Sequence, residues 1–238
     1  RGNAGDEKFQ CILTDPKNRH VLDILPKRQS ESLYSYFSGF DREERNQVGY
    51  VVMDMSSLFR GVIKRCFPKA HIIADRYHVV RQVTWALDNV RKNEQKKFSK
   101  DRRLHFKHSR KILLKPSSRL TDDEKDQLTV MLQASPRIRE AYLRKVEFEK
   151  VMDSNSSKEA GKRLSQWISF TQNAQIPEFE KCCDTFIKWA KEITGSFDHP
   201  YTNGYTEGVN NKIKVIKRIS FGVRDFERFR NRILYAMA

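Results

Sequence analysis

The stretch Val48–Asp54, which reads VGYVVMD, decides the fold class. It is a largely apolar run of the kind that a strand buried on both faces of a sheet requires, and it ends in an aspartate. The segment Ser56–Pro68 then has apolar residues at helical spacing and a proline that ends the helix. A second short apolar run, Ala70–Asp75, ends in another aspartate. This alternation of strand and helix predicts an α/β sheet with parallel members.

The residues before this stretch predict a β-hairpin and a helix. Phe9–Thr14 and Val21–Leu25 are β-rich runs, and Asp15–Asn18 between them has strong turn chemistry. Ser30 is expected to cap a helix whose apolar residues recur at roughly helical spacing, and Asp41–Asn46 is expected to be a polar loop.

From about Tyr77 onward the pattern changes, and only helical stretches are predicted. They are separated by breaks at Pro116, Ser135–Pro136, Ser154–Ser156 and Pro177. The sequence therefore predicts an α/β module followed by a helical array.

Charge indicates the class of partner. The chain has 46 Lys and Arg against 30 Asp and Glu, a net charge of +16. Arg91–Arg119 holds twelve basic residues against two acidic ones, a net of +10, and Glu207–Arg232 holds eight against three, a net of +5. Such clusters attract a polyanion by releasing its counterions, so nucleic acid is the expected partner. The alternative is a set of well-solvated helix surfaces rich in lysine.

The remaining composition favours a soluble globular protein of a reducing cytoplasm. Hydrophobic residues make up 38% of the chain and are spread along it. The sequence has neither an export leader nor an apolar run long enough to span a membrane. Its four cysteines form neither a C-x-x-C pair nor a disulfide framework.

Two aspartates stand where open α/β sheets place functional groups. Asp54 and Asp75 each follow an apolar strand directly, at its carboxyl end. Spacing alone leaves a second interpretation open for each. Asp54 could instead be the N-cap of the next helix, and Asp75 could be a surface acid before a long helix.

Glu207 begins a helix with two different faces. Val209, Ile213 and Ile216 recur at the spacing of a buried stripe. The opposite stripe carries Glu207 followed by Asn211, Lys214 and Arg218. A carboxylate at the head of a row of phosphate-binding groups would repel the backbone that the cations attract, unless it holds a metal. The alternative is a glutamate in the first helical turn, favourable with the helix dipole.

Carboxylates at a sheet edge within a basic surface suit two-metal phosphoryl transfer. One Mg²⁺ activates the attacking oxygen and the other stabilises the leaving oxygen, and this ion requires hard oxygen ligands. Mg²⁺ or Mn²⁺ is the expected cofactor.

Four segments closely resemble the ISL-three family of bacterial insertion-sequence transposases, which belongs to the DDE superfamily. They are Cys11–Pro26, Val52–Ser56, Ala74–Arg81 and, most specifically, Asn203–Lys214. The resemblance covers nearly the whole chain. It implies a ribonuclease H-like core in 1–90, a large basic all-helical insertion in 91–197, and core helices that carry the third acid in 198–238.

The resemblance also implies roles for individual residues. Asp54 is the second catalytic acid and metal ligand, and Glu207 is the third. Asp75 and His78 form an Asp-x-x-His pair that shapes the site. The first acid lies on a central strand, flanked by the strands that end at Asp15 and Asp54, and that strand is expected upstream of this chain. Asp6 is not assigned to this role.

The implied activity is Mg²⁺-dependent cleavage and strand transfer at transposon ends. The implied partners are double-stranded DNA, at transposon ends and target, and further copies of the protein on DNA, in the cytoplasm and nucleoid and without a membrane. The residues expected to contact DNA are Arg76, Lys96, Lys97, Arg102, Arg103, Lys107, Arg110, Lys111, Asn211, Lys212, Lys214, Lys217 and Arg218. Two alternatives stay open: an inactive DNA-binding transposase fragment, favoured by the missing first acid, and a helical nucleic-acid-binding protein without nuclease activity.

Overall fold

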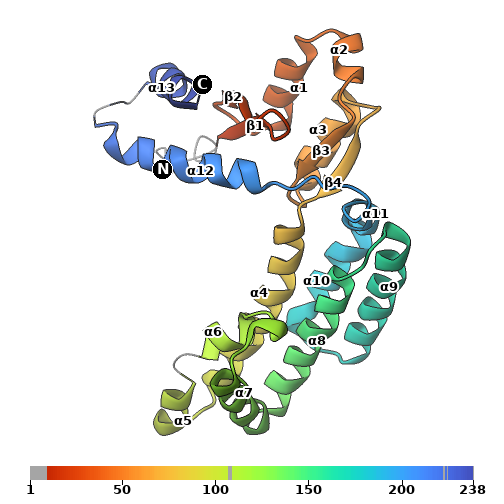
Figure 1. Ribbon diagram of the computed structural model, residues 1–238, viewed down its shortest axis with the longest axis vertical. Coiled ribbons are helices and arrows are strands. Elements are labelled where there is room, and N and C mark those ends of the chain that lie inside the picture. Colours follow the sequence, from red (N-terminus) through yellow and green to blue (C-terminus); the bar gives the residue numbers. More distant parts are fainter. Residues whose placement is uncertain (1–9, 107–108, 222, 224, 238) are drawn as a thin grey trace. The chain divides into compact units, whose positions relative to one another are not determined.

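The computed structural model describes residues 10–106, 109–221, 223 and 225–237 (Figure 1). The chain forms two compact units. The first unit combines residues 1–73 with residues 201–238, and the second comprises residues 74–200. Residues 91–197, the predicted insertion, all lie in the second unit.

The first unit contains two small sheets. Strands β1 (Cys11–Asp15) and β2 (His20–Leu25) form the predicted antiparallel hairpin, in which Cys11 lies opposite Leu25. Strands β3 (Tyr50–Met53) and β4 (His71–Ala74) pair with each other in a separate sheet, which confirms both predicted strands.

Strand β3 differs from the prediction in its burial. Tyr50 is 40% exposed, and Val51 and Val52 are half-buried, so the expected burial on both faces was wrong. Within the described residues β3 has only one strand partner, β4, so it stands at the edge of a two-stranded sheet.

Three short helices connect these strands: α1 (Ser30–Ser38), α2 (Arg42–Asn46) and α3 (Ser57–Cys66). The N-cap of α1 is Gln29, so the capping role predicted for Ser30 was wrong. The predicted loop at Asp41–Asn46 is also wrong, because Asp41 and Glu44 form a capping box that starts α2.

The two carboxyl-terminal helices pack on the hairpin. Helix α12 (Gly204–Ile219) buries Val209 and Ile216, as its apolar stripe predicted, and α13 (Phe226–Met237) buries Ile233. These side chains form one hydrophobic cluster with Val21 and Ile24 of β2. Residues near the two ends of the chain therefore build one core.

A buried carboxylate links β2 to α13. Asp23 Oδ1 accepts hydrogen bonds from Arg230 Nε at 2.6 Å and from the Ile24 backbone N–H at 2.6 Å, and Oδ2 accepts from the Tyr36 hydroxyl at 2.9 Å. Burial opposes ionisation of Asp23, but the hydrogen bonds from Arg230, Tyr36 and Ile24 outweigh it, and the pKa of this carboxyl is lowered.

We expect Asp23→Asn to lower the free energy of unfolding by about 2 kcal/mol at pH 7, because it weakens charge-assisted hydrogen bonds. Since the folded-state pKa is lowered, the stabilisation is present above the unfolded-state pKa and is lost as the pH falls through the folded value. Urea denaturation from pH 7 to pH 2 should therefore show the two proteins converging in acid. A constant difference across that range would contradict this account. Asp126→Asn, at an exposed carboxylate, is the control.

The second unit is helical, and no strand follows β4 in the described part of the chain, as predicted. It contains α4 (Arg76–Gln95), α5 (Lys100–His105), α6 (Ser109–Leu114), the 3₁₀ turn η2 (Ser117–Arg119), α7 (Asp122–Ala134), α8 (Pro136–Met152), α9 (Ser157–Asn173), α10 (Pro177–Lys188) and α11 (Ala190–Gly195). Helix α4 packs against α8 and α10, and α9 packs against α8, α10 and α11 (Figure 1). Pro136 and Pro177 stand in the first turns of their helices, where a missing N–H costs nothing.

Aromatic side chains form the core of this unit. Phe148 and Phe186 stack with ring centroids 5.3 Å apart, and Trp167 lies 4.9 Å and 5.6 Å from them. Trp167 also donates its indole N–H to the carbonyl oxygen of Arg144 at 2.7 Å. The cluster joins α8, α9 and α10.

None of the helices in the described residues combines the length and the hydropathy that a bilayer crossing requires. All four cysteines are free thiols.

Candidate metal centre and nucleic-acid interface

Asp54 lies immediately after β3 and does not cap the next helix. The N-cap of α3 is Ser56, whose hydroxyl accepts from the Phe59 backbone N–H at 3.4 Å. The Asp54 Oδ1 atom is buried and has no hydrogen-bond partner. The capping alternative is thus excluded. Burying a carboxylate oxygen that accepts no hydrogen bond costs free energy unless a positive charge compensates it. Asp54 Oδ1 therefore suits the role of a ligand to a divalent cation.

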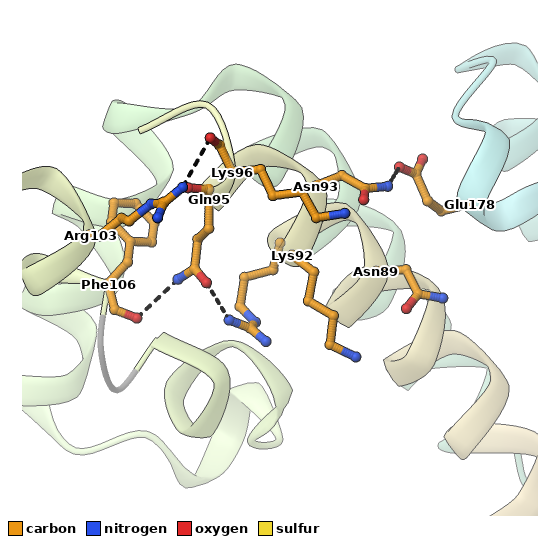
Figure 2. Close-up of a pocket in the computed structure, with 9 residues that line it drawn as sticks. Asn89, Lys92, Asn93, Gln95, Lys96, Arg103, Phe106 and Glu178 are labelled. Carbon is orange, nitrogen blue, oxygen red and sulfur yellow. Dashed lines mark hydrogen bonds between the residues drawn. The ribbon is translucent and has the colours of Figure 1, made fainter. Parts of the chain in front are cut away.

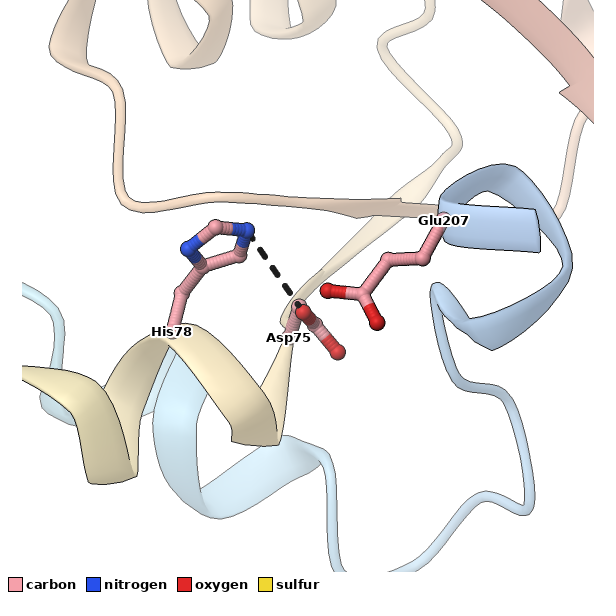
Figure 3. Close-up of side chains that lie close together, drawn as sticks. All are labelled: Asp75, His78 and Glu207. Carbon is pink, nitrogen blue, oxygen red and sulfur yellow. Dashed lines mark ion pairs between the residues drawn. The ribbon is translucent and has the colours of Figure 1, made fainter. Parts of the chain in front are cut away.

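Asp75 lies at the N-cap position of α4, directly after β4, but its side chain makes no capping hydrogen bond. It is only 4% exposed, so the interpretation as a surface acid was wrong. Its Oδ2 atom is buried without a hydrogen-bond partner and lies 3.8 Å from His78 Nε2 (Figure 3). The structure thus brings this predicted pair together, one helical turn apart.

Glu207 lies in the first turn of α12 (Figure 3), and that turn is attached to the β-hairpin. The Thr206 hydroxyl lies 2.8 Å from the Thr14 hydroxyl, and the Tyr205 hydroxyl donates to the Arg19 carbonyl oxygen at 2.6 Å. These contacts and the buried Val209 fix the carboxylate-bearing turn beside the end of β1.

Asp54 and Glu207 both belong to the first unit, and different ends of strand β1 relate to them. At its start, burial raises the pKa of the Cys11 thiol to about 11, with Arg28 opposing and the negative charge of Asp54 contributing. At its other end, Thr14 contacts the residue next to Glu207. Cys11 and Thr14 are three residues apart, which corresponds to about 10 Å along a strand. The turn that bears Glu207 is thus bonded to one end of β1, and the charge of Asp54 is felt at the other end.

Helix α12 presents the predicted row of polar and basic side chains. The residues Asn211, Lys212, Lys214, Lys217 and Arg218 are all exposed. Lys214 Nζ donates to Asn211 Oδ1 at 3.1 Å, and Lys212 Nζ donates to the Ala236 carbonyl oxygen at 2.8 Å. Lys217 and Arg218 have no recorded acceptor among the described residues. They are therefore the least engaged cations of this helix.

Several of the predicted DNA contacts in the second unit are engaged within the protein. Arg76 donates to the Ser196 carbonyl oxygen at 2.8 Å and lies over the Phe197 ring. Lys97 pairs with Glu94 at 2.6 Å.

The same holds on α5 and α6. Arg102 donates to the Ala134 carbonyl oxygen, Arg103 donates to two carbonyl oxygens at the end of α4, and Arg110 lies 3.5 Å from Asp88. Lys111 is exposed, and Lys107 lies outside the described residues. Asn89 and Lys92, which the sequence analysis did not single out, are exposed on α4 at helical spacing with Lys96.

Comparison with known proteins gives the family. A family model described as a transposase matches residues 1–233. The transposase for insertion sequence element IS1001 of Bordetella parapertussis is 27% identical over 225 residues, which cover 93% of this chain and 55% of the relative. The transposase for insertion sequence element IS1557 of Mycobacterium tuberculosis is 25% identical over 240 residues, covering 91% and 54%.

A local match to a Lactococcus lactis protein named ATP-dependent protease, 37% identical, covers only 29% of this chain and does not show a family. No solved structure matches the chain. The chain spans about half the length of the two transposases that it matches. Because the family model covers almost all of its residues, the chain belongs to the ISL-three family of insertion-sequence transposases.

Proposed function

We propose that this chain is the catalytic portion of a DNA transposase that cleaves transposon ends and joins their 3′-hydroxyls to target DNA. The observation that carries the proposal is the buried, unpartnered Oδ1 of Asp54 at the end of β3, in a chain of the transposase family. Family membership supports DNA as the substrate, and the net charge of +16 is in keeping with it.

The proposed cofactor is Mg²⁺ or Mn²⁺, held by Asp54 and Glu207. Both side chains offer hard carboxylate oxygens, and neither is the N-cap of a helix, so these oxygens are not used for capping. When bound, such an ion lowers the pKa of an attacking water and stabilises charge on the phosphate. Asp54 and Glu207 orient the ion, while Lys217 and Arg218 of α12 position the phosphate backbone. Asp75 and His78 keep the site-shaping role that the resemblance implies.

The proposed core is ribonuclease H-like, with one further strand between β1 and β3 that carries the first acid. The observation that favours this strand is that β1 and β3 each have a single strand partner among the described residues. An edge without a partner presents unpaired backbone N–H and C=O groups, which a further strand would satisfy. That strand is expected to be required for catalysis.

The proposed partners are double-stranded DNA and further copies of the protein assembled on it, in the bacterial cytoplasm and nucleoid. Helix α12 and the helical insertion are the DNA-contacting parts. The second candidate is an inactive DNA-binding transposase fragment, because the net charge of +16 supports DNA binding with or without cleavage.

A strand-cleavage assay on a labelled transposon end tests both candidates. We expect a version extended upstream to nick and join DNA with Mg²⁺ and to be inactive in EDTA, and the present chain to bind DNA without cleaving it. Binding without cleavage by the extended version would instead support the inactive candidate. Absence of binding by either version would contradict both.

A further inference from the structure

An open cavity of about 770 Å³ lies on the helical unit, along the carboxyl-terminal half of α4 (Figure 2). Four cationic side chains line it, from Arg91, Lys92, Lys96 and Arg103, against a single carboxylate, that of Glu178. Asp88, outside the lining, pairs with Arg91 and Lys92, and the walls still keep a net positive charge, which favours an anionic ligand.

The two arginines line the cavity, but their guanidinium groups already donate hydrogen bonds within the protein. Arg91 donates to Asp88 at 2.8 Å and to Gln95 at 2.6 Å. Arg103 donates to the carbonyl oxygens of Gln95 and Lys96 at 3.0 Å and 3.1 Å, which offsets the negative end of the α4 dipole. Both guanidinium groups are held by protein acceptors and contribute charge without needing to move.

The two lysines are the candidate binding groups of the lining. Lys92 is exposed, and its acceptor Asp88, at 2.9 Å, is shared with Arg91 and Arg110. Lys96 is also exposed, and no acceptor for it is recorded in the described part of the chain. The two residues are four positions apart on one helix face, about 6 Å along the axis. This spacing is comparable to that of consecutive phosphates on one nucleic-acid strand.

The Glu178 carboxylate in the cavity wall does not neutralise the two lysines. Burial disfavours its ionisation, but hydrogen bonds from Asn93 at 2.9 Å and from Arg137 at 2.9 Å outweigh it and lower the pKa of Glu178. Its charge is thus paired with Arg137, outside the cavity lining. Asn89, one turn before Lys92 or Asn93, adds an exposed amide donor on the same face.

We propose that this cavity binds consecutive phosphates of a DNA strand through Lys92 and Lys96. The proposal rests on the proposed function, since it takes the substrate to be DNA. It narrows the broad basic surface predicted at residues 96–111 to one face of α4, where Lys92 and Lys96 line the cavity side by side. Lys92 pairs with Asp88 but its side chain is still 55% exposed. A small phosphorylated molecule is the competing occupant.

The test measures binding of a random 20-base-pair duplex by fluorescence anisotropy, in EDTA, over a series of salt concentrations. The Lys92→Gln, Lys96→Gln double variant should bind about 10-fold more weakly, and its log–log salt slope should fall by about two, one for each lost phosphate contact. The matched control is the Lys158→Gln, Lys162→Gln double variant on α9, which removes the same charge from exposed lysines. Its salt slope should change by less than half as much.

A wild-type salt slope in the α4 variant, or an equal loss in the control, would overturn the proposal. Competition by pyrophosphate combined with an unchanged DNA slope would assign the cavity to a small anion and would also overturn it. Circular dichroism verifies that both variants are folded. Because the assay contains no metal, its result is independent of strand cleavage, so failure of the catalytic assignment and failure of this site are distinguishable.

Discussion

Glu207→Ala in the full-length transposase is expected to reduce Mg²⁺-dependent strand cleavage by about 10³-fold or more. A lost metal ligand removes several kcal/mol of transition-state stabilisation, and about 1.4 kcal/mol corresponds to a factor of ten in rate. DNA affinity should change by less than about threefold, because removing a carboxylate deprives the basic face of α12 of no phosphate contact. Single-turnover cleavage of a labelled transposon end measures the rate, and anisotropy measures binding.

Asp54→Ala should reduce strand cleavage by a similar factor, because it also removes a proposed metal ligand. The buried Oδ1 of Asp54 makes no hydrogen bond within the protein, so its loss should not disturb the fold through a lost hydrogen bond. The matched control is Glu227→Gln, at an exposed glutamate in the first turn of the neighbouring helix α13. It should cleave at the wild-type rate. Cleavage within tenfold of wild type by either alanine variant would refute the metal assignment of that residue.

The largest expected effect on stability is that of Phe148→Ala, at about 3–5 kcal/mol of unfolding free energy. Phe148 is 2% exposed and contacts the rings of Trp167 and Phe186, so its removal leaves a cavity where α8, α9 and α10 meet. Urea denaturation followed by circular dichroism at 222 nm measures the loss, since the helices of the second unit dominate that signal.

Phe170→Ala is the matched control, because Phe170 lies on α9 but is 41% exposed. The Arg144 guanidinium lies 4.0 Å from the centroid of its ring, so a loss of about 1 kcal/mol is expected. Equal losses from the two variants would show that the aromatic cluster is not the main core of this unit.

The local patterns in the sequence were sufficient for most elements of the fold. Turn chemistry at Asp15–Asn18 predicted the hairpin, and the stripe through Val209 and Ile216 predicted the buried face of α12. The misses have specific causes. Helix α2 was missed because the polar composition of its residues is typical of loops. Its start depends instead on the reciprocal Asp41–Glu44 capping box.

The candidate site was only partly predictable. Position after an apolar strand identified Asp54 and Asp75, but a choice between capping and ligand roles required knowing that Ser56 caps α3 and that both aspartates have a buried, unpartnered oxygen. Which basic residues are available was only partly predictable. The partner of Lys97, Glu94, lies three positions away on the same helix, but the acceptor of Arg102, Ala134, lies 32 positions away in sequence. Long-range contacts of this kind decide whether a cation supports the fold or is free to bind a ligand.

Anomalous diffraction from crystals of the full-length protein grown with Mn²⁺ is the most direct measurement on the central claim. The account predicts a Mn²⁺ peak bound by carboxylate oxygens of both Asp54 and Glu207, at about 2.1–2.2 Å. Two ions about 4 Å apart would fit the two-metal chemistry. Carboxylates of Asp54 and Glu207 more than about 10 Å apart, with no Mn²⁺ peak between them, would contradict it.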